Sequence, residues 1–212
     1  MDCPGTGTKT LDEFCAEHPR VALAFSGGGD SSYLLSALLD RSVQVKAYFV
    51  QSAFQYPFET ADARRVACEL GAELEVIELD VLSQEAICAN PPERCYLCKR
   101  FIFGAIQGQM AREGFSVLVD GTNATDDPAR RPGFRALAEL GVLSPLRLAG
   151  LGKDEVRQAA HACGLFTADK PNFSCLATKV EAGTPLTAEL LGAVLKQEEE
   201  TGSEVRSWNS MS

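Results

Sequence analysis

The sequence has few of the residues that several classes of protein need. Two histidines and one tryptophan occur among 212 residues, and the histidines, His18 and His161, are far apart. A zinc site built on several histidines is therefore excluded. No apolar run approaches the length of a membrane span, so we expect no membrane contact. The opening stretch MDCPGTGTKTLDEF lacks the charged-then-apolar order of a secretory signal, and we expect a cytoplasmic protein.

Basic residues are also scarce relative to acidic ones. Twenty Lys and Arg stand against 29 Asp and Glu, which gives a formal net charge of -9. Because binding to a phosphate backbone relies on Lys and Arg, this balance argues against a broad nucleic-acid surface. A net charge of this size is still compatible with a local basic pocket.

The chain contains eight cysteines, which in a reducing compartment do not predict a disulfide framework. Four lie in apolar or helical patterns and are interpreted as small hydrophobic residues: Cys15, Cys68, Cys88 and Cys163. Cys3 lies in the N-terminal tail. Cys95, Cys98 and Cys175 require another explanation.

Apolar segments of strand and helix type alternate along the chain. Strands are predicted at residues 21–25, 43–50, 73–79 and 116–120, with helices of ten or more residues between most of them. Such spacing predicts parallel pairing with right-handed crossovers. We therefore expect an α/β fold, a doubly wound parallel sheet with helices on both faces. Asn90, followed by two prolines and Glu93, predicts the start of a helix that runs to about Glu113.

Ligands of such sheets bind beyond the carboxyl ends of the strands. Ser26–Ser32, with the sequence SGGGDSS, follows the first predicted strand and opens a helix. Glycines permit a tight turn with exposed N–H groups, and the helix N-terminus adds a positive dipole, so the segment suits an anion. Asp30 fits beside a phosphate if Mg²⁺ bridges the two. The lysine of a Walker A loop is absent, and a simple helix-capping turn is the alternative.

The complete SGGGDSS string resembles the PP-loop of the ATP pyrophosphatase superfamily, whose members bind the pyrophosphate of ATP and transfer AMP to an oxygen. The resemblance implies ATP and Mg²⁺ as cofactors. The segment VDGTNATDD resembles the later G-T-N segment of that superfamily, although alone it is also typical of an ordinary turn. The implied nucleotide contacts are Ser26, Gly27, Gly28, Gly29, Ser31, Ser32, Ser52, Gly121, Thr122 and Asn123. Asp126 or Asp127, close to the G-T-N segment, would join Asp30 at the metal.

Three further motifs narrow the resemblance: NPPERCYLCKR, GTNATDDPARRPGFRALAELGVLSPL and DKPNFSCLATK, in that order. Together they resemble the LarE family of ATP-dependent sacrificial sulfur transferases. The family implies adenylation of a pyridinium dicarboxylate mononucleotide, a small nucleotide-like substrate, during synthesis of the nickel-pincer nucleotide cofactor of lactate racemase. A protein cysteine then gives up its own sulfur and becomes dehydroalanine. The family motif places that cysteine at Cys175.

A thiolate is the strongest side-chain nucleophile near neutral pH, which independently suits Cys175 to attack an acyl adenylate. Lys170 and Lys179 would lower its pKa; a buried structural cysteine is the alternative. Arg94, Lys99, Arg131 and Arg135 are expected to contact substrate carboxylate or phosphate. The roles of Cys95 and Cys98 stay open. The additional cysteines that hold an iron–sulfur cluster in some family members are absent around Cys175, so we expect no cluster.

The chain departs from the family pattern at Gly29, where valine is usual, and at Leu176–Lys179, where LSSR is usual. We expect a PP-loop domain at residues 1–180 and a C-terminal helix and tail at 181–212, with the family's substrate domain missing. An oligomer, expected to be a homo-oligomer, or another partner would then complete the site. A tRNA-thiolating enzyme, an amide-forming ligase and a non-catalytic nucleotide-binding regulator are the alternative functions.

Overall fold

A parallel sheet organises the molecule. The computed structural model describes residues 9–127, 133–202 and 205–208. Four strands lie in the order β3-β2-β1-β4, and every pair is parallel. They are β1 (Arg20–Ala24), β2 (Gln44–Gln51), β3 (Glu73–Glu78) and β4 (Leu118–Asp120). The predicted α/β parallel fold is confirmed.

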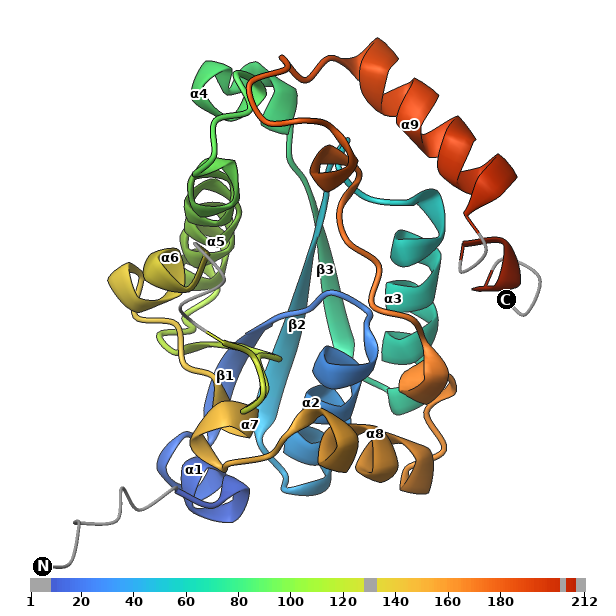
Figure 1. The fold of residues 1–212 in the computed structure, drawn as a ribbon. Coiled ribbons are helices and arrows are strands. Elements are labelled where there is room, and N and C mark those ends of the chain that lie inside the picture. Colours follow the sequence, from blue (N-terminus) through green and yellow to red (C-terminus); the bar gives the residue numbers. More distant parts are fainter. Residues whose placement is uncertain (1–8, 128–132, 203–204, 209–212) are drawn as a thin grey trace, which may run out of the picture.

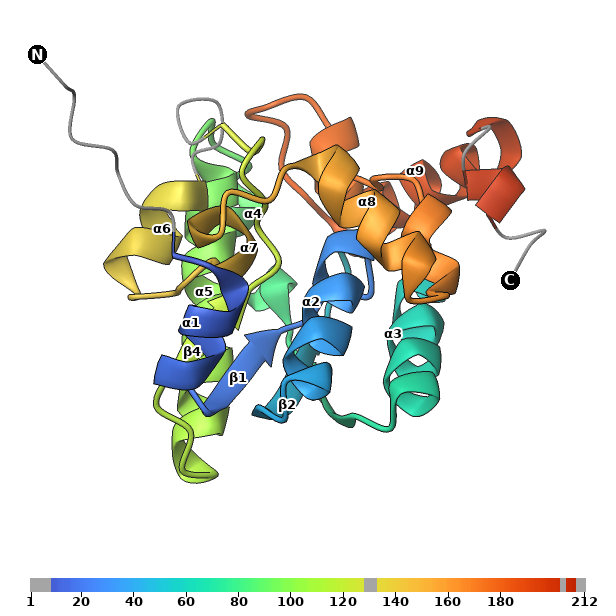
Figure 2. The same ribbon diagram turned by 90° about the horizontal axis from the view of Figure 1, so that it is seen from below.

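Helices cover both faces of this sheet, as Figures 1 and 2 show. One face packs on α1 (Leu11–Glu17), α2 (Gly29–Asp40) and α3 (Pro57–Leu70); the other packs on α5 (Arg94–Arg112) and α6 (Gly133–Glu139). The alternation of a strand explains the division, because successive side chains point to opposite faces. In β1, Val21 and Leu23 join the first core and Ala22 joins the second.

The remaining elements are η1 (Val81–Ser83), α4 (Glu85–Cys88), α7 (Pro145–Leu148), α8 (Lys153–Ala162), η3 (Phe166–Asp169), η4 (Leu176–Lys179) and α9 (Ala188–Thr201). Leu146 of α7 and Val156 of α8 join the first core. A third apolar cluster joins Phe54 and Ile87 to Leu176, Leu191 and Val205. The N–H of Leu176 also donates to the carbonyl of Phe54 at 2.8 Å. The segment around Cys175 is thus anchored to the turn that follows β2.

The predicted start of α5 is wrong by three residues. Asn90 adopts a left-handed conformation with φ of 51° and does not cap the helix, which begins at Arg94. Its side chain instead accepts from Arg94 Nη1 at 2.7 Å and donates to the carbonyl of Glu181 at 2.9 Å. A tertiary contact has overridden a local capping signal. The predicted end of the helix agrees with the structure to within a residue.

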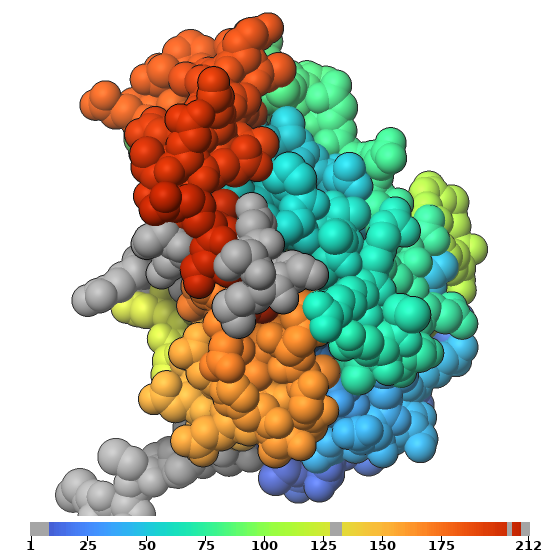
Figure 3. Space-filling model, turned by 90° about the vertical axis from the view of Figure 1, so that its right-hand side faces the viewer, coloured from blue at the N-terminus to red at the C-terminus, as the bar shows by residue number. Residues whose placement is uncertain are grey.

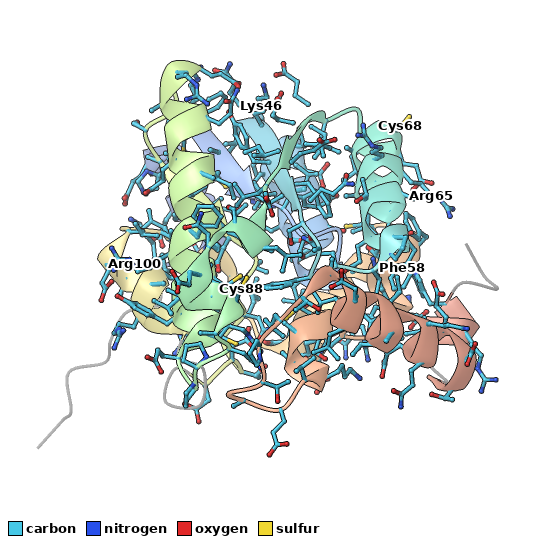
Figure 4. The ribbon with its side chains drawn as sticks, turned by 90° about the horizontal axis from the view of Figure 1, so that it is seen from above. Lys46, Phe58, Arg65, Cys68, Cys88 and Arg100 are labelled. Carbon is cyan, nitrogen blue, oxygen red and sulfur yellow. The ribbon has the colours of Figure 1, made fainter. Side chains whose placement is uncertain are left out.

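The four cysteines interpreted as small hydrophobic residues have different environments. Cys15 is buried and Cys88 is half-buried, but Cys68 and Cys163 are exposed, so the interpretation is wrong for these two. Cys68 projects from α3 away from the sheet (Figure 4). A helical pattern alone does not distinguish the inner face of a helix from its outer face. Among the described residues, no helix combines the length and apolar character that crossing a bilayer requires.

The ends of β1 and β4 approach each other closely. A Cβ added to Gly121, just after β4, would lie 2.9 Å from both the Cα and the backbone N of Ser31 in α2. No real Cβ tolerates such a contact with backbone. Glycine at this position is therefore a packing requirement.

Substituting Gly121→Ala is expected to destabilise the protein by about 1–3 kcal/mol, because the backbone of α2 has to move. Gly104→Ala is the matched control, since Gly104 lies inside α5 and an added Cβ would meet nothing within 4 Å. It should stabilise the protein by up to about 1 kcal/mol through helix propensity. Urea unfolding midpoints measure both. Equal stability of Gly121→Ala and the wild type would contradict the close approach.

Candidate functional site

A cavity of about 940 Å³ opens where β1 and β4 end. The strand order reverses at β1, and ligands of doubly wound sheets bind at such switch points. Its volume lies within the range of small-molecule sites. The glycine loop after β1, the segment after β4, the first turns of α5 and α8, and the segment from Lys170 to Cys175 all contribute to its walls. Segments far apart in the sequence thus meet at one place.

The glycine loop has the compact backbone that an anion site needs. Gly27 has a left-handed φ of 67°, and a Cβ on Gly29 would lie 2.9 Å from the carbonyl oxygen of Thr167. Ser31 Oγ donates to the carbonyl of Gly28 at 3.1 Å. The Ser32 hydroxyl is buried and has no hydrogen-bond partner among the described residues. Together with the unpaired N–H groups of a helix start, this loop is suited to phosphate.

Asp30 is the centre of a polar network at the mouth of the loop. Lys153 Nζ lies 2.9 Å from its Oδ2 and 3.2 Å from its Oδ1, and Asn123 Nδ2 donates to Oδ2 at 3.1 Å. Lys153 also donates to Asn172 Oδ1 at 2.9 Å. One lysine thereby joins the glycine loop to the segment that leads to Cys175.

Asp126 also lines the cavity, and its Oδ2 accepts from the N–H of Asn123 at 3.2 Å. Neighbouring Asp120 accepts from Thr122 Oγ1 at 2.5 Å and from Ser144 Oγ at 2.6 Å. In the described ranges, no group of three or more His, Cys, Asp or Glu side chains is arranged to hold a metal ion. Asp30 and Asp126 each present hard oxygen donors to the cavity, and Mg²⁺ commonly takes one or two carboxylates when phosphate oxygens are also available to it.

Cys175 lines the same cavity. Burial raises the pKa of its thiol above the ordinary value, and the positive charge of Arg94 opposes that shift. The expected lowering of the pKa by Lys170 and Lys179 is therefore wrong. Lys179 pairs instead with Glu198 at 3.0 Å.

Cys95 lines the cavity as well, whereas Cys98 packs with Cys175 against the third apolar cluster. Burial raises the pKa of Cys98 to about 12, with further contributions from the two other thiols. The three cysteines therefore lie near one another. A thiol with so high a pKa stays protonated at neutral pH, and a protonated thiol is a poor nucleophile.

Two predicted substrate contacts have other partners in the structure. Arg94 is buried, and its Nη1 donates to the carbonyl of Ala177 at 2.7 Å, two residues beyond Cys175. Arg135 stacks on the ring of Tyr96 at 3.5 Å and pairs with Glu139 on the outside of α6. Lys99 does line the cavity. Arg131 lies outside the described residues.

The predicted nucleotide contacts are placed in two groups. Those that line the cavity are Ser26, Gly28, Gly29, Ser31, Gly121, Thr122 and Asn123, and the predicted metal ligand Asp30 lines it with them. Gly27 and Ser32 form the back of the loop, while Ser52 follows β2 and hydrogen-bonds Gln55. Sequence reasoning missed Lys153. The only signal was a lysine directly after Gly152 at a helix start, which by itself is common.

No protein-family model matches this chain, but curated proteins do. It is 32% identical over 191 residues to the uncharacterized protein slr1717 of Synechocystis, covering 90% of this chain and 71% of that protein. It is 25% identical to the tRNA-specific 2-thiouridylase MnmA of Thermotoga petrophila, over 71% of this chain and 54% of that enzyme.

A third relative carries a specific enzymatic name. The chain is 32% identical over 195 residues to pyridinium-3,5-bisthiocarboxylic acid mononucleotide synthase of Lactiplantibacillus plantarum, covering 91% of this chain and 71% of that enzyme. This likeness spans all the segments that form the cavity. The chain therefore belongs to the LarE family within the PP-loop superfamily.

Proposed function

We propose that this protein is an ATP-dependent sulfur transferase that converts a carboxylate of a pyridinium dicarboxylate mononucleotide to a thiocarboxylate. One observation carries the proposal: Cys175 and the glycine loop line the same cavity. A nucleophile beside a phosphate site is what transfer from an acyl adenylate requires. The name of the Lactiplantibacillus relative supports the choice of substrate.

In the first step a substrate carboxylate oxygen attacks the α-phosphorus of ATP, the bond to the β-phosphate breaks, and pyrophosphate leaves. The loop N–H groups and Lys153 hold the leaving pyrophosphate. Asp30 and Asp126 would hold Mg²⁺, which supplies charge neutralisation of the phosphates when bound. Lys99, which lines the same cavity, would contact the anionic substrate.

In the second step the Cys175 thiolate attacks the acyl carbon and AMP leaves, which gives a thioester. Loss of the Cys175 α-proton and cleavage of its Cβ–S bond then release the thiocarboxylate and leave dehydroalanine. Arg94 acts from within the protein: it fixes the Ala177 carbonyl and favours the thiolate through its charge. Each chain transfers one sulfur atom.

A tRNA substrate is less well supported. The similarity to the 2-thiouridylases is lower and covers only 54% of those enzymes. The net charge of -9 also disfavours an RNA backbone. The likeness to the LarE relative favours the small-molecule substrate.

The proposal predicts that incubation with ATP, Mg²⁺ and the pyridinium dicarboxylate mononucleotide removes the mass of H₂S from Cys175. Intact mass and peptide mapping measure the loss. Cys98→Ala is the matched control and should retain it, because Cys98 is not among the described residues that line the cavity. An unmodified Cys175 with pyrophosphate released would refute the sulfur donor but retain adenylation.

Lys153→Met is expected to weaken ATP binding by roughly 10- to 100-fold, because a charged hydrogen bond contributes about 1.5–3 kcal/mol. Lys196→Met is the control, since Lys196 lies on α9 with its side chain 77% exposed. Asp30→Asn should abolish Mg²⁺-dependent pyrophosphate release. Calorimetry and a pyrophosphate assay measure the effects. ATP binding by Lys153→Met that matches the control would rule out a phosphate contact.

The raised pKa of Cys175 predicts a shifted pH profile of alkylation. The rate follows the thiolate, so its midpoint should lie above the ordinary cysteine pKa of about 8.5. Arg94→Met should move the midpoint still higher, because it removes the charge that lowers the pKa, whereas Arg94→Lys should move it less. Exposed Cys68 verifies the reagent in the same samples. A midpoint at or below the ordinary value would contradict the role of burial.

A further inference from the structure

A buried ion pair lies directly behind the glycine loop. Lys170 Nζ and Asp62 Oδ2 are 2.6 Å apart, and the two side chains are 3% and 4% exposed. Asp62 belongs to α3, and Lys170 begins the segment that ends at Cys175. A charge removed from water at this depth requires its partner, so neither residue is exchangeable by itself.

Lys170 also contacts the glycine loop. Its Nζ donates to the carbonyl of Gly27 at 3.1 Å, and the residue lines the cavity. Gly27 has a left-handed φ, and a Cβ there would lie 3.1 Å from the backbone of Ala63 in α3. The lysine therefore holds the loop from behind, in a conformation that few residues adopt.

A segment far along the chain completes this arrangement. Trp208 Nε1 donates to the same Oδ2 of Asp62 at 2.8 Å, and its ring lies 5.6 Å from Lys170 Nζ. Phe58 lies 5.5 Å from the same ammonium, and Phe166 stacks on Trp208. Figure 4 labels Phe58 at the start of α3, and Figure 3 shows the C-terminal segment in red against the surface of the preceding elements. The ammonium is enclosed by a carboxylate and aromatic rings.

We propose that Asp62 and Trp208 are positioning residues for Lys170, and that Lys170 couples the segment Val205–Trp208 to nucleotide bound at the glycine loop. This inference rests on the proposed function, because it requires ATP to bind the loop. A polyphosphate in the loop places negative charge near Gly27 and draws the ammonium toward the cavity. Trp208 senses the displacement, since it shares Asp62 with the lysine.

Trp208 is the only tryptophan in the 212 residues, so tryptophan emission reports on the surroundings of this one side chain. Titration of the wild-type chain with ATP and Mg²⁺ is expected to give a saturable change in tryptophan emission, with the Kd that calorimetry measures. Pyrophosphate should give the same change and AMP a smaller one. Trp208→Phe, which contains no tryptophan, gives the background emission of the other residues and keeps an aromatic ring near Lys170. Free tryptophan titrated with the same nucleotide corrects for absorption.

Two further variants distinguish an effect of Lys170 on ATP binding from an effect on the stability of the fold. Lys170→Met alone leaves Asp62 buried without its cation, and it is expected to lower the melting temperature. The double variant Asp62→Leu, Lys170→Met replaces the pair by apolar residues, which recovers stability in comparable buried pairs. We expect the double variant to melt near the wild type and yet to bind ATP roughly tenfold more weakly.

Wild-type affinity for ATP in the double variant, or an unchanged Trp208 emission at saturating ATP in the wild type, would overturn the inference. The emission experiment uses the wild-type chain alone, so it decides the matter even if a variant fails to fold. Failure of the wild type to bind ATP by calorimetry would refute the proposed function instead. The two failures are thus distinguished.

Discussion

The ends of β1 and β4 lie so close together that no side chain fits between Gly121 and the backbone of Ser31. This approach brings the glycine loop and the G-T-N segment to one edge of the sheet, and Asn123 reaches Asp30 as a result. Hydrogen bonds connect the other cavity segments to this edge of the sheet. Lys153 contacts Asp30. The segment that leads to Cys175 is connected through Lys170, which donates to the carbonyl of Gly27, and through Asn172, which accepts from Lys153. The cavity is therefore a consequence of parallel strands adjoining at the switch point.

Two lysines that line the cavity are paired with carboxylates, Lys153 with Asp30 and Lys170 with Asp62. The acidic side chains of the cavity outnumber the lysines, although the proposed ligand is an anion. The repulsion of an anionic ligand is weaker than the number of carboxylates suggests. Asp120 accepts hydrogen bonds from two hydroxyl groups, and the charge of Asp30 is neutralised by Lys153. A divalent cation at Asp30 would release Lys153 to the phosphates. A net charge of -9 over the whole chain is thus compatible with a local site for the proposed polyphosphate.

Much of the fold could be predicted from the sequence, because alternating strands and helices have strong periodic signals. The SGGGDSS loop, the G-T-N segment and Cys175 could be selected as candidates because each lies in a continuous sequence motif, and the structure brings them to one cavity. Lys153 and the Asp62–Trp208 contact could not be predicted, since their meaning depends on distances created by the crossovers. Arg94 illustrates the converse: its type predicted a substrate contact, but its position in α5 directs it to the Ala177 carbonyl. Asn90 shows a local signal overridden by a tertiary hydrogen bond.

In the proposed reaction the glycine loop and Cys175 act in sequence on one substrate. The decisive measurement is product analysis by ³¹P NMR on Cys175→Ala, supplied with ATP, Mg²⁺ and the pyridinium dicarboxylate mononucleotide. We expect pyrophosphate and an acyl adenylate without any thiocarboxylate, because only the second step lacks its nucleophile. Formation of ADP and phosphate, or a thiocarboxylate product from this variant, would contradict the proposed reaction.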